Sequence, residues 1–193
     1  MSYTEKSGRG ANVRVLNNRS TDAVDGDWYA THPSSVEALL SVEQFSDRVL
    51  EPCVGGGAIA DVLTSHGHEV TGWDIADRGW PGTELRDYLT VEEGWDGDVV
   101  TNPPYRLAKE FVEKSLEIVG PGRKVAMLLK LTFLESQKRW PLFMENPPLR
   151  VWVFRERQVC GANGVFDARS SAVCYAWFVW SKGYKGAPEI RWL

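Results

Sequence analysis

Four consecutive residues, Asn102-Pro103-Pro104-Tyr105, have the composition needed to hold a planar group that carries an amino nitrogen. Asn102 supplies a side-chain oxygen acceptor, and Tyr105 supplies a flat ring. The two prolines fix the backbone and remove two N–H donors, which leaves carbonyl oxygens to face a pocket. Two acceptors can bind the two N–H bonds of an exocyclic amino group while the tyrosine stacks on the attached ring. The alternative is a rigid turn that only ends a strand.

A glycine-rich loop lies upstream, between a predicted strand at 48–52 and a predicted helix at 58–65. Its sequence, Gly55-Gly56-Gly57-Ala58-Ile59-Ala60, fits the pattern G-x-G-x-x-G/A. Glycines let the backbone approach a ligand closely, and the helix N-terminus offers unpaired N–H groups. Asp74, 17 residues after Gly57, ends the next predicted strand and can accept hydrogen bonds from both ribose hydroxyls of a nucleoside. Glycines alone also fit NAD-binding folds and tight turns. With the strand, helix and acid in place, they predict a nucleoside-containing cofactor.

The elements that must position these residues alternate between strands and helices. Predicted strands cover residues 48–52, 69–75, 98–101, 124–131, 149–154 and 172–180. Predicted helices cover 33–40, 58–65 and 107–119, with a helix or ordered loop at 132–143. This pattern predicts an α/β fold whose mostly parallel sheet has helices on both faces, with the last two strands as an antiparallel hairpin at one edge. Ligands of such sheets bind at the carboxyl ends of the strands, which favours the site interpretation of Asn102 over the turn.

Composition limits the classes of function. The chain has 193 residues, 43% of them hydrophobic and 25% charged, as in a soluble globular domain. Its longest apolar run is half the length that spans a bilayer, so we expect no membrane partner. The net charge of −4 argues against a large basic surface for nucleic acid. Three cysteines without metal-ligand spacing indicate reduced thiols in a cytoplasm, and no metal site is predicted.

Several other residues have two interpretations each. Residues 1–27 are polar and aperiodic, which predicts a flexible arm before a single domain at 28–193. His66 and His68 lack a third metal ligand, which favours surface histidines. Phe133 and Phe166 could stack on a base, but core packing is favoured. Some basic residues either follow a phosphate backbone or form an outer face, and the sequence does not decide between them: Lys130, Lys138, Arg139, Arg150, Arg155 and Arg157.

Taken together, these motifs over about residues 27–180 resemble S-adenosylmethionine-dependent amino-methyltransferases, most closely DNA adenine-N6 methyltransferases of the kind carried by phages and prophages. The resemblance implies a class I methyltransferase (Rossmann-like) fold. Trp28-Tyr29-Ala30-Thr31-His32-Pro33 is similar to the family's Tyr-x-Thr-Pro segment, and 51–57 to its cofactor loop. Asp74 matches the ribose-binding acid, and Asp87-Tyr88-Leu89 resembles the segment that contacts the cofactor's adenine. The motif order is that of the gamma arrangement.

By this resemblance, the catalytic residues are Asn102, Pro103, Pro104 and Tyr105. The residues implied to bind S-adenosylmethionine are Tyr29, Thr31, Glu51, Pro52, Cys53, Gly55, Gly57, Asp74, Ile75, Asp87, Tyr88 and Asn102. His32 departs from the family pattern because it separates Thr31 from Pro33. The long target-recognition domain of restriction-linked members is also missing.

The expected activity is methyl transfer to an exocyclic amino nitrogen, with adenine N6 in DNA as the leading acceptor and DNA as the partner. Because that atom is inaccessible in a duplex, the base should flip into the pocket. Cytosine N4, an RNA base or a protein glutamine remain alternative acceptors. A non-catalytic nucleic-acid-binding module and a nicotinamide-dependent oxidoreductase are alternatives from other classes. The sequence leaves the oligomeric state open.

Overall fold

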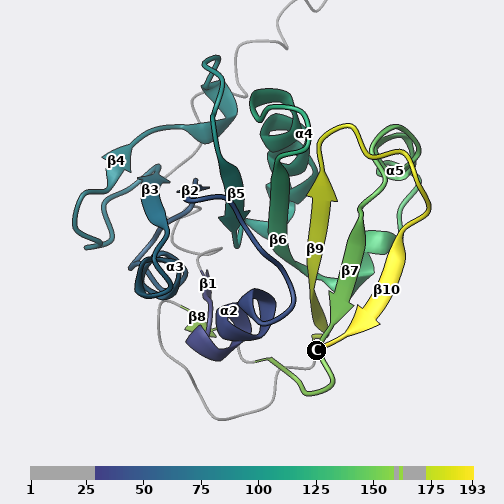
Figure 1. Cartoon of the computed structure of the whole chain (residues 1–193), viewed down its shortest axis with the longest axis horizontal. Helices are drawn as coiled ribbons and strands as arrows, with labels where there is room; N and C mark the ends of the chain where they lie inside the picture. Colours follow the sequence, from purple (N-terminus) through teal and green to yellow (C-terminus); the bar gives the residue numbers. More distant parts are fainter. Residues whose placement is uncertain (1–28, 159–160, 163–172) are drawn as a thin grey trace, which may run out of the picture.

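The computed structural model describes residues 29–158, 161–162 and 173–193. The predicted arm at 1–27, Trp28 and Phe166 lie outside the described residues. One sheet of eight strands runs through the molecule in the order β10-β7-β9-β6-β5-β2-β3-β4 (Figure 1). Its strands are β2 (Arg48–Glu51), β3 (Glu69–Asp74), β4 (Glu84–Leu85), β5 (Asp98–Thr101), β6 (Lys124–Lys130), β7 (Arg150–Val153), β9 (Tyr175–Ser181) and β10 (Glu189–Trp192).

All neighbouring strands are parallel except that β9 is antiparallel to both β6 and β7. The predicted mostly parallel sheet and the antiparallel pair of closing strands are therefore confirmed. Strand β10 was not predicted, and it lies outside that pair, parallel to β7. Its four residues, Glu-Ile-Arg-Trp, are all exposed, so no buried face marked them as a strand. A separate two-stranded ribbon joins β1 (Tyr29–Ala30) to β8 (Gly161–Ala162).

Helices cover both faces of the sheet, as the alternation of elements predicted. Helices α2 (Pro33–Leu40) and α3 (Ala60–Ser65) pack on one face, and α4 (Ala108–Ile118) and α5 (Trp140–Glu145) pack on the other. The 132–143 segment, predicted as a helix or ordered loop, contains the end of a 3₁₀ turn, Leu131–Leu134, and the start of α5. Two further 3₁₀ turns cover Tyr88–Thr90 and Tyr105–Leu107.

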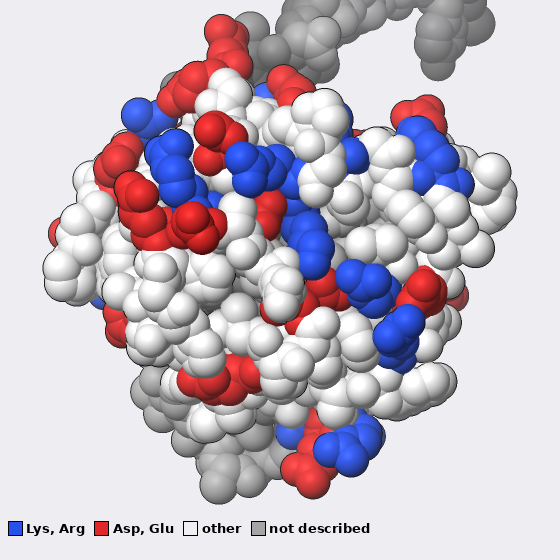
Figure 2. Space-filling view, in the orientation of Figure 1, with Lys and Arg blue, Asp and Glu red and all other residues white. Residues whose placement is uncertain are grey.

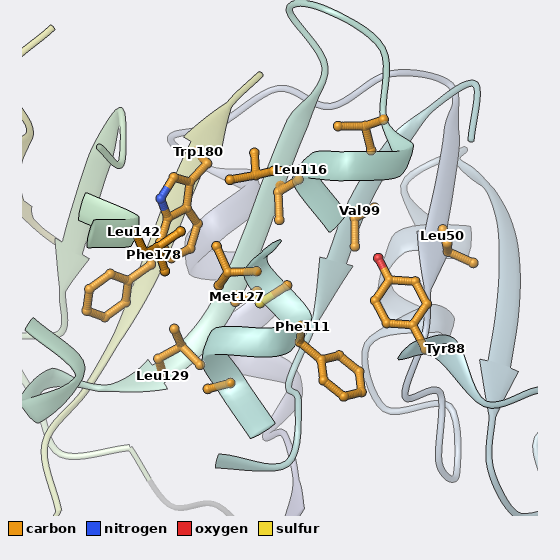
Figure 3. Packing of buried hydrophobic residues seen from close by; sticks show 14 of the residues in the cluster. Leu50, Tyr88, Val99, Phe111, Leu116, Met127, Leu129, Leu142, Phe178 and Trp180 are labelled. Atoms are coloured by element: carbon orange, nitrogen blue, oxygen red, sulfur yellow. The ribbon is translucent and has the colours of Figure 1, made fainter. Parts of the chain in front are cut away.

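The central strand β6 has buried side chains on both faces, as expected of a parallel sheet covered by helices. Val125, Met127 and Leu129 point toward α4 and α5, while Ala126 and Leu128 point toward α2 and α3. Figure 3 shows the first of these two cores, in which Met127 and Leu129 lie between the aromatic groups of β9 and those around α4.

Phe133 belongs to this core. Its ring makes edge contacts with Phe143, Phe178 and Trp180 at centroid distances of 5.6–6.4 Å. Only 6% of Phe133 is exposed, so the packing interpretation is confirmed for this residue. The indole nitrogen of Trp180 donates to the carbonyl of Asn146, and that of Trp177 donates to the carbonyl of Ser35. Buried indoles with satisfied N–H groups are part of the framework.

Candidate active site at the carboxyl edge of the sheet

The predicted site residues converge on one edge of the sheet. Strands β2, β3, β5 and β6 are parallel, so their last residues, Glu51, Asp74, Thr101 and Lys130, all lie at the carboxyl edge. The glycine loop, the Asp87 turn and the Asn102 tetrapeptide each follow one of these strands or the short strand β4. This is the edge at which open α/β sheets bind ligands.

Two glycines of the loop adopt left-handed backbone conformations, with φ of 53° at Gly55 and 86° at Gly57. Such values are costly for residues with a Cβ atom. The Gly55 N–H donates to the Asp74 carboxylate at 2.9 Å, and the Val54 N–H donates to the Trp73 carbonyl at 2.9 Å. These two bonds fix the loop against the end of β3.

The ring of Trp80 also restricts position 57 to glycine. A Cβ atom at position 57 would lie 2.0 Å from the Trp80 ring, and one at Gly72 would lie 2.4 Å from the same ring. The Trp80 indole nitrogen donates to Asp61 of α3 at 3.0 Å. The indole therefore occupies the space beside these two glycines and links the β3–β4 segment to α3. Trp80 was not predicted as a site residue, although a tryptophan in the turn-rich run Arg78-Gly79-Trp80-Pro81-Gly82 indicates a packed loop.

Asp74 holds the glycine loop at the carboxyl edge of the sheet, where the ligand is predicted to bind. Its carboxylate accepts the backbone N–H groups of Gly55 and Ala76, and the Arg78 guanidinium lies 3.9 Å away. A carboxylate has about four acceptor positions, so these contacts do not exhaust it. The next residue, Ile75, is 44% exposed and presents an apolar surface beside the acid. That combination suits the ribose and the flat base of a nucleoside.

Glu51 is a buried carboxylate without a cationic partner among the described residues. It is 2% exposed, and its Oε2 atom has no hydrogen-bond partner in the described part of the chain. Burial raises the pKa of Glu51 well above its usual range, and the nearby charges of Asp74 and Asp61 raise it further, while the Ala60 N–H lowers it. A cationic group bound at this edge would relieve that cost. Pro52, also buried, follows Glu51 in the loop.

Cys53 and Tyr88, both of the predicted cofactor set, pack in or against the core. Burial raises the pKa of the Cys53 thiol, and the charges of Asp74 and Glu51 add to the effect, so Cys53 is a neutral packing residue. The Tyr88 hydroxyl lies 2.7 Å from Ser115 of α4, and its side chain is 2% exposed in the core. Burial raises the Tyr88 pKa. Asp87 caps the 3₁₀ turn by accepting the Leu89 N–H at 3.2 Å.

The tetrapeptide is held against the segment after β1. The Asn102 amide nitrogen donates to the Thr31 hydroxyl at 3.1 Å, which directs the buried carbonyl oxygen of Asn102 away from Thr31. The Pro104 carbonyl accepts the Leu107 N–H, so the Pro103 carbonyl is the candidate for a second substrate acceptor. Tyr105 begins the following 3₁₀ turn, and its ring centroid lies 5.7 Å from that of Tyr175.

The unusual His32 has a local explanation. It is the N-cap of α2, and its Nδ1 atom accepts the Ser34 N–H at 3.3 Å, with Pro33 at the first helical position. The insertion therefore caps the helix and leaves Thr31, 2% exposed, in contact with Asn102. Tyr29 contributes its backbone to β1.

Arg139, Arg150 and Arg155, three of the candidate phosphate-binding residues, bind other groups of the protein. Arg139 donates to the Phe133, Thr132 and Glu135 carbonyls. Arg150 binds Glu43, and Arg155 donates to the carbonyl of the last residue. Lys138 and Arg157 are exposed. Figure 2 shows acidic and basic side chains interspersed on one face instead of a single basic surface.

The two other histidines also contact protein atoms. His66 pairs with Glu37 at 2.8 Å, and His68 contacts the Ser46 carbonyl at 2.9 Å. Across the described ranges, no three potential metal-binding side chains gather at one place. No helix in the described part of the chain combines the length and apolar character needed to span a bilayer.

Comparison with known proteins places the fold. No family model matches the sequence, and no curated protein resembles it significantly in sequence. Among solved structures, a proposed RNA methyltransferase from Pyrococcus horikoshii superposes with a TM-score of 0.59 at 13% identity, covering 82% of this chain and 88% of that one. A predicted O-methyltransferase from Agrobacterium tumefaciens gives 0.58 at 13% identity, with 78% and 81% coverage. The 23S rRNA methyltransferase ErmE gives 0.53 at 18% identity, with 79% and 68% coverage. The chain therefore has the class I methyltransferase fold.

Proposed function

We propose that this protein transfers a methyl group from S-adenosylmethionine to an exocyclic amino nitrogen, with adenine N6 in DNA as the acceptor. The observation that carries the proposal is the contact between Asn102 and Thr31 at the carboxyl edge. It fixes the direction of an amide oxygen at the same edge of the sheet as two buried carboxylates, Glu51 and Asp74. One end of the site thus has acceptors for an amino group, and the other has carboxylates for a cationic nucleoside.

The residues of the glycine loop fit S-adenosylmethionine. This cofactor has two cationic groups, a sulfonium and an ammonium, and when bound it supplies an electrophilic methyl. Glu51 has a buried oxygen without a partner among the described residues, so a cation there would offset its desolvation. Asp74 would accept the ribose hydroxyls while it holds Gly55, and Ile75 would cover the base. Asp87 would receive the amino group of that base.

Asn102 would orient the acceptor. Its carbonyl oxygen and that of Pro103 would accept the two N–H bonds of the substrate amine, which turns the nitrogen lone pair toward the methyl. Tyr105 would stack on the attached ring. A neutral amine attacks and loses its proton afterwards, so no strong base is required, and positioning would supply most of the acceleration.

The choice of DNA adenine rests on the resemblance of the tetrapeptide and of the motif order. Cytosine N4 and an RNA base present the same amino chemistry and are the alternatives within this class. A binding module without activity is the alternative outside it, against which the ordered Asn102-Thr31 contact argues. We also propose that this domain reads a short or degenerate target context.

The test is incubation with labelled S-adenosylmethionine and either DNA or RNA, followed by mass spectrometry of the nucleosides. N6-methyladenine from DNA is the expected product, and N4-methylcytosine or modification of RNA alone would correct the acceptor. The matched control is Asn102→Ala, which should keep cofactor affinity in calorimetry while losing most methyl transfer. A wild-type protein that binds no S-adenosylmethionine would refute the proposal.

A further inference from the structure

Lys130 contacts the tetrapeptide that is predicted to bind the acceptor. It is the last residue of β6, and its ammonium lies 4.8 Å from the centroid of the Tyr105 ring. Tyr175, its directly opposed partner in β9, also packs against Tyr105. A lysine above an aromatic face is held by attraction to the ring electrons. The cation is therefore placed beside the ring on which the substrate would stack.

Among the described residues, no acidic side chain lies within ion-pair distance of Lys130. Of the basic residues flagged in the sequence, Arg139 and Arg150 are instead bound to carbonyl groups or to Glu43. Lys130 is the member of that group that contacts the tetrapeptide.

The acidic residues at this edge favour a nearby cation for a nucleic-acid substrate. Glu51, Asp74 and Asp87 lie at the same edge, and the whole chain carries a net charge of −4. A phosphate next to a stacked base would meet repulsion unless a positive group lay close by. One compact ammonium at the rim of the stacking position supplies it.

We propose that Lys130 binds a backbone phosphate adjacent to the target nucleotide, so the substrate is a nucleotide within a strand and not a free base or an amide side chain. The inference rests on the proposed function. It assigns Lys130 to substrate binding, separate from the cofactor end of the site. The lysine would leave the Tyr105 face, or share it, when the phosphate arrives.

The experiment pairs a protein change with a substrate change. Single-stranded oligonucleotides with one target base carry a neutral methylphosphonate at the linkage on its 5′ side, on its 3′ side, or at a distant position. In the wild-type protein, one adjacent neutral linkage should raise KM about tenfold, the effect of losing one charge-assisted contact. In Lys130→Met, the all-phosphate substrate should show that raised KM, and the methylphosphonate should cause no further loss.

Two protein controls accompany it. Lys185→Met removes the same charge from the turn between β9 and β10, at the opposite edge of the sheet, and should keep the full sensitivity to the neutral linkage. Lys130→Arg keeps a cation and should retain most of that sensitivity. The affinity of each variant for S-adenosylmethionine should stay within twofold of wild type, which a general loss of structure would not allow.

The outcomes separate this inference from the proposed function. If wild type methylates DNA and Lys130→Met remains as sensitive to the adjacent methylphosphonate as wild type, the Lys130 assignment is wrong and the methyltransferase proposal stands. If a neutral linkage leaves the KM of the wild-type protein unchanged on both sides of the target base, the Lys130 assignment is also wrong. Absence of cofactor binding, or of methylation on any nucleic acid, would instead refute the proposed function.

Discussion

Two buried glutamates lie at opposite edges of the sheet and have opposite surroundings. Glu43, at the amino edge, is 3% exposed and is bound by Lys124 at 2.7 Å, by Arg150 at 2.5 and 3.1 Å, and by the Trp152 indole at 2.9 Å. Glu51, at the carboxyl edge, is 2% exposed and has no cation beside it among the described residues. The described residues therefore compensate the charge of Glu43 but not that of Glu51.

The pKa directions follow from this difference. Burial raises the pKa of Glu43, but the hydrogen bonds from Arg150, Lys124 and Trp152 outweigh burial and lower it to about 2. Burial raises the pKa of Glu51, and no cation among the described residues opposes this shift. A fully paired buried charge is typical of a structural network, whereas an uncompensated one at a ligand-binding edge is typical of a functional site.

A hollow of about 340 Å³ lies beside Glu43 and is lined by the network of Glu43, Lys124 and Arg150. Its lining includes Ser41, Gln44, Lys124 and Arg150, and both cations already face Glu43. The network ties the segment after α2 to the first residues of β6 and β7. It therefore connects elements that lie far apart in the sequence.

The largest expected effect is on stability. Glu43→Ala should lower the free energy of unfolding by about 3–5 kcal/mol, because it leaves Lys124 and Arg150 partly buried without their counter-ion. Urea denaturation followed by circular dichroism measures this change. Glu43→Gln, which keeps an acceptor for Trp152, is the matched control and should lose less. A cost below about 1 kcal/mol would show that the amino-edge network is not structural.

Acid should weaken the same network. The folded-state pKa of Glu43, about 2, lies below its unfolded value of 4.5, so its contribution is present above pH 4.5 and is lost as the pH falls toward 2. The loss amounts to about 3 kcal/mol over that range. The measurement is the difference in unfolding free energy between wild type and Glu43→Gln at several pH values. A constant difference from pH 5 to pH 2.5 would contradict the assignment.

The Asp74→Ala variant tests whether the carboxyl edge of the sheet binds the cofactor. Asp74→Ala should weaken S-adenosylmethionine binding by about 1.5–3 kcal/mol, the scale of lost charge-assisted hydrogen bonds. Because Asp74 also accepts the Gly55 N–H, the variant should lose some stability without ligand. Calorimetric titration gives the first quantity and thermal denaturation the second. Unchanged affinity would mean that Asp74 serves the loop alone.

Glu51 should give the smallest change in affinity and the sharpest contrast with Glu43. Glu51→Gln keeps the shape of the side chain and removes the charge, so it should weaken binding of the cationic cofactor by about 1.5 kcal/mol. Without ligand, the same variant should be more stable than wild type at pH 8, since a raised folded-state pKa costs stability as the pH rises above 4.5.

The pH dependence of cofactor binding tests independently whether Glu51 becomes ionised when the cofactor binds. A bound cation favours ionised Glu51, so cofactor affinity should increase with pH through the titration of the free protein, with release of a proton. Calorimetry in two buffers of different ionisation enthalpy detects that proton. Glu51→Gln should abolish its release. A Glu51→Gln variant that binds as tightly as wild type and is less stable would make Glu51 a second structural carboxylate.

The amino-acid sequence by itself determined that the predicted site residues share one edge of the sheet. Strand and helix periods, with glycine and proline at the turns, placed the cofactor loop, Asp74 and Asn102 at strand ends, because these signals are local along the chain. The burial of β6 and β9 also followed from their continuous apolar runs. The sequence did not predict strand β10, because its exposed residues Glu-Ile-Arg-Trp form no apolar run.

Only the tertiary structure decided the long-range contacts. Lys124 and Arg150 meet Glu43 across 81 and 107 residues of chain, Trp80 fills the space beside Gly57 and Gly72, and Lys130 lies over Tyr105. These contacts depend on strand order and register, which sequence periodicity does not encode. Arg139 and Arg150 are a further example. From the sequence, either could bind phosphate, but in the fold Arg139 donates to carbonyl groups and Arg150 binds Glu43. A charged side chain acquires its role from its partners, and packing chooses those partners.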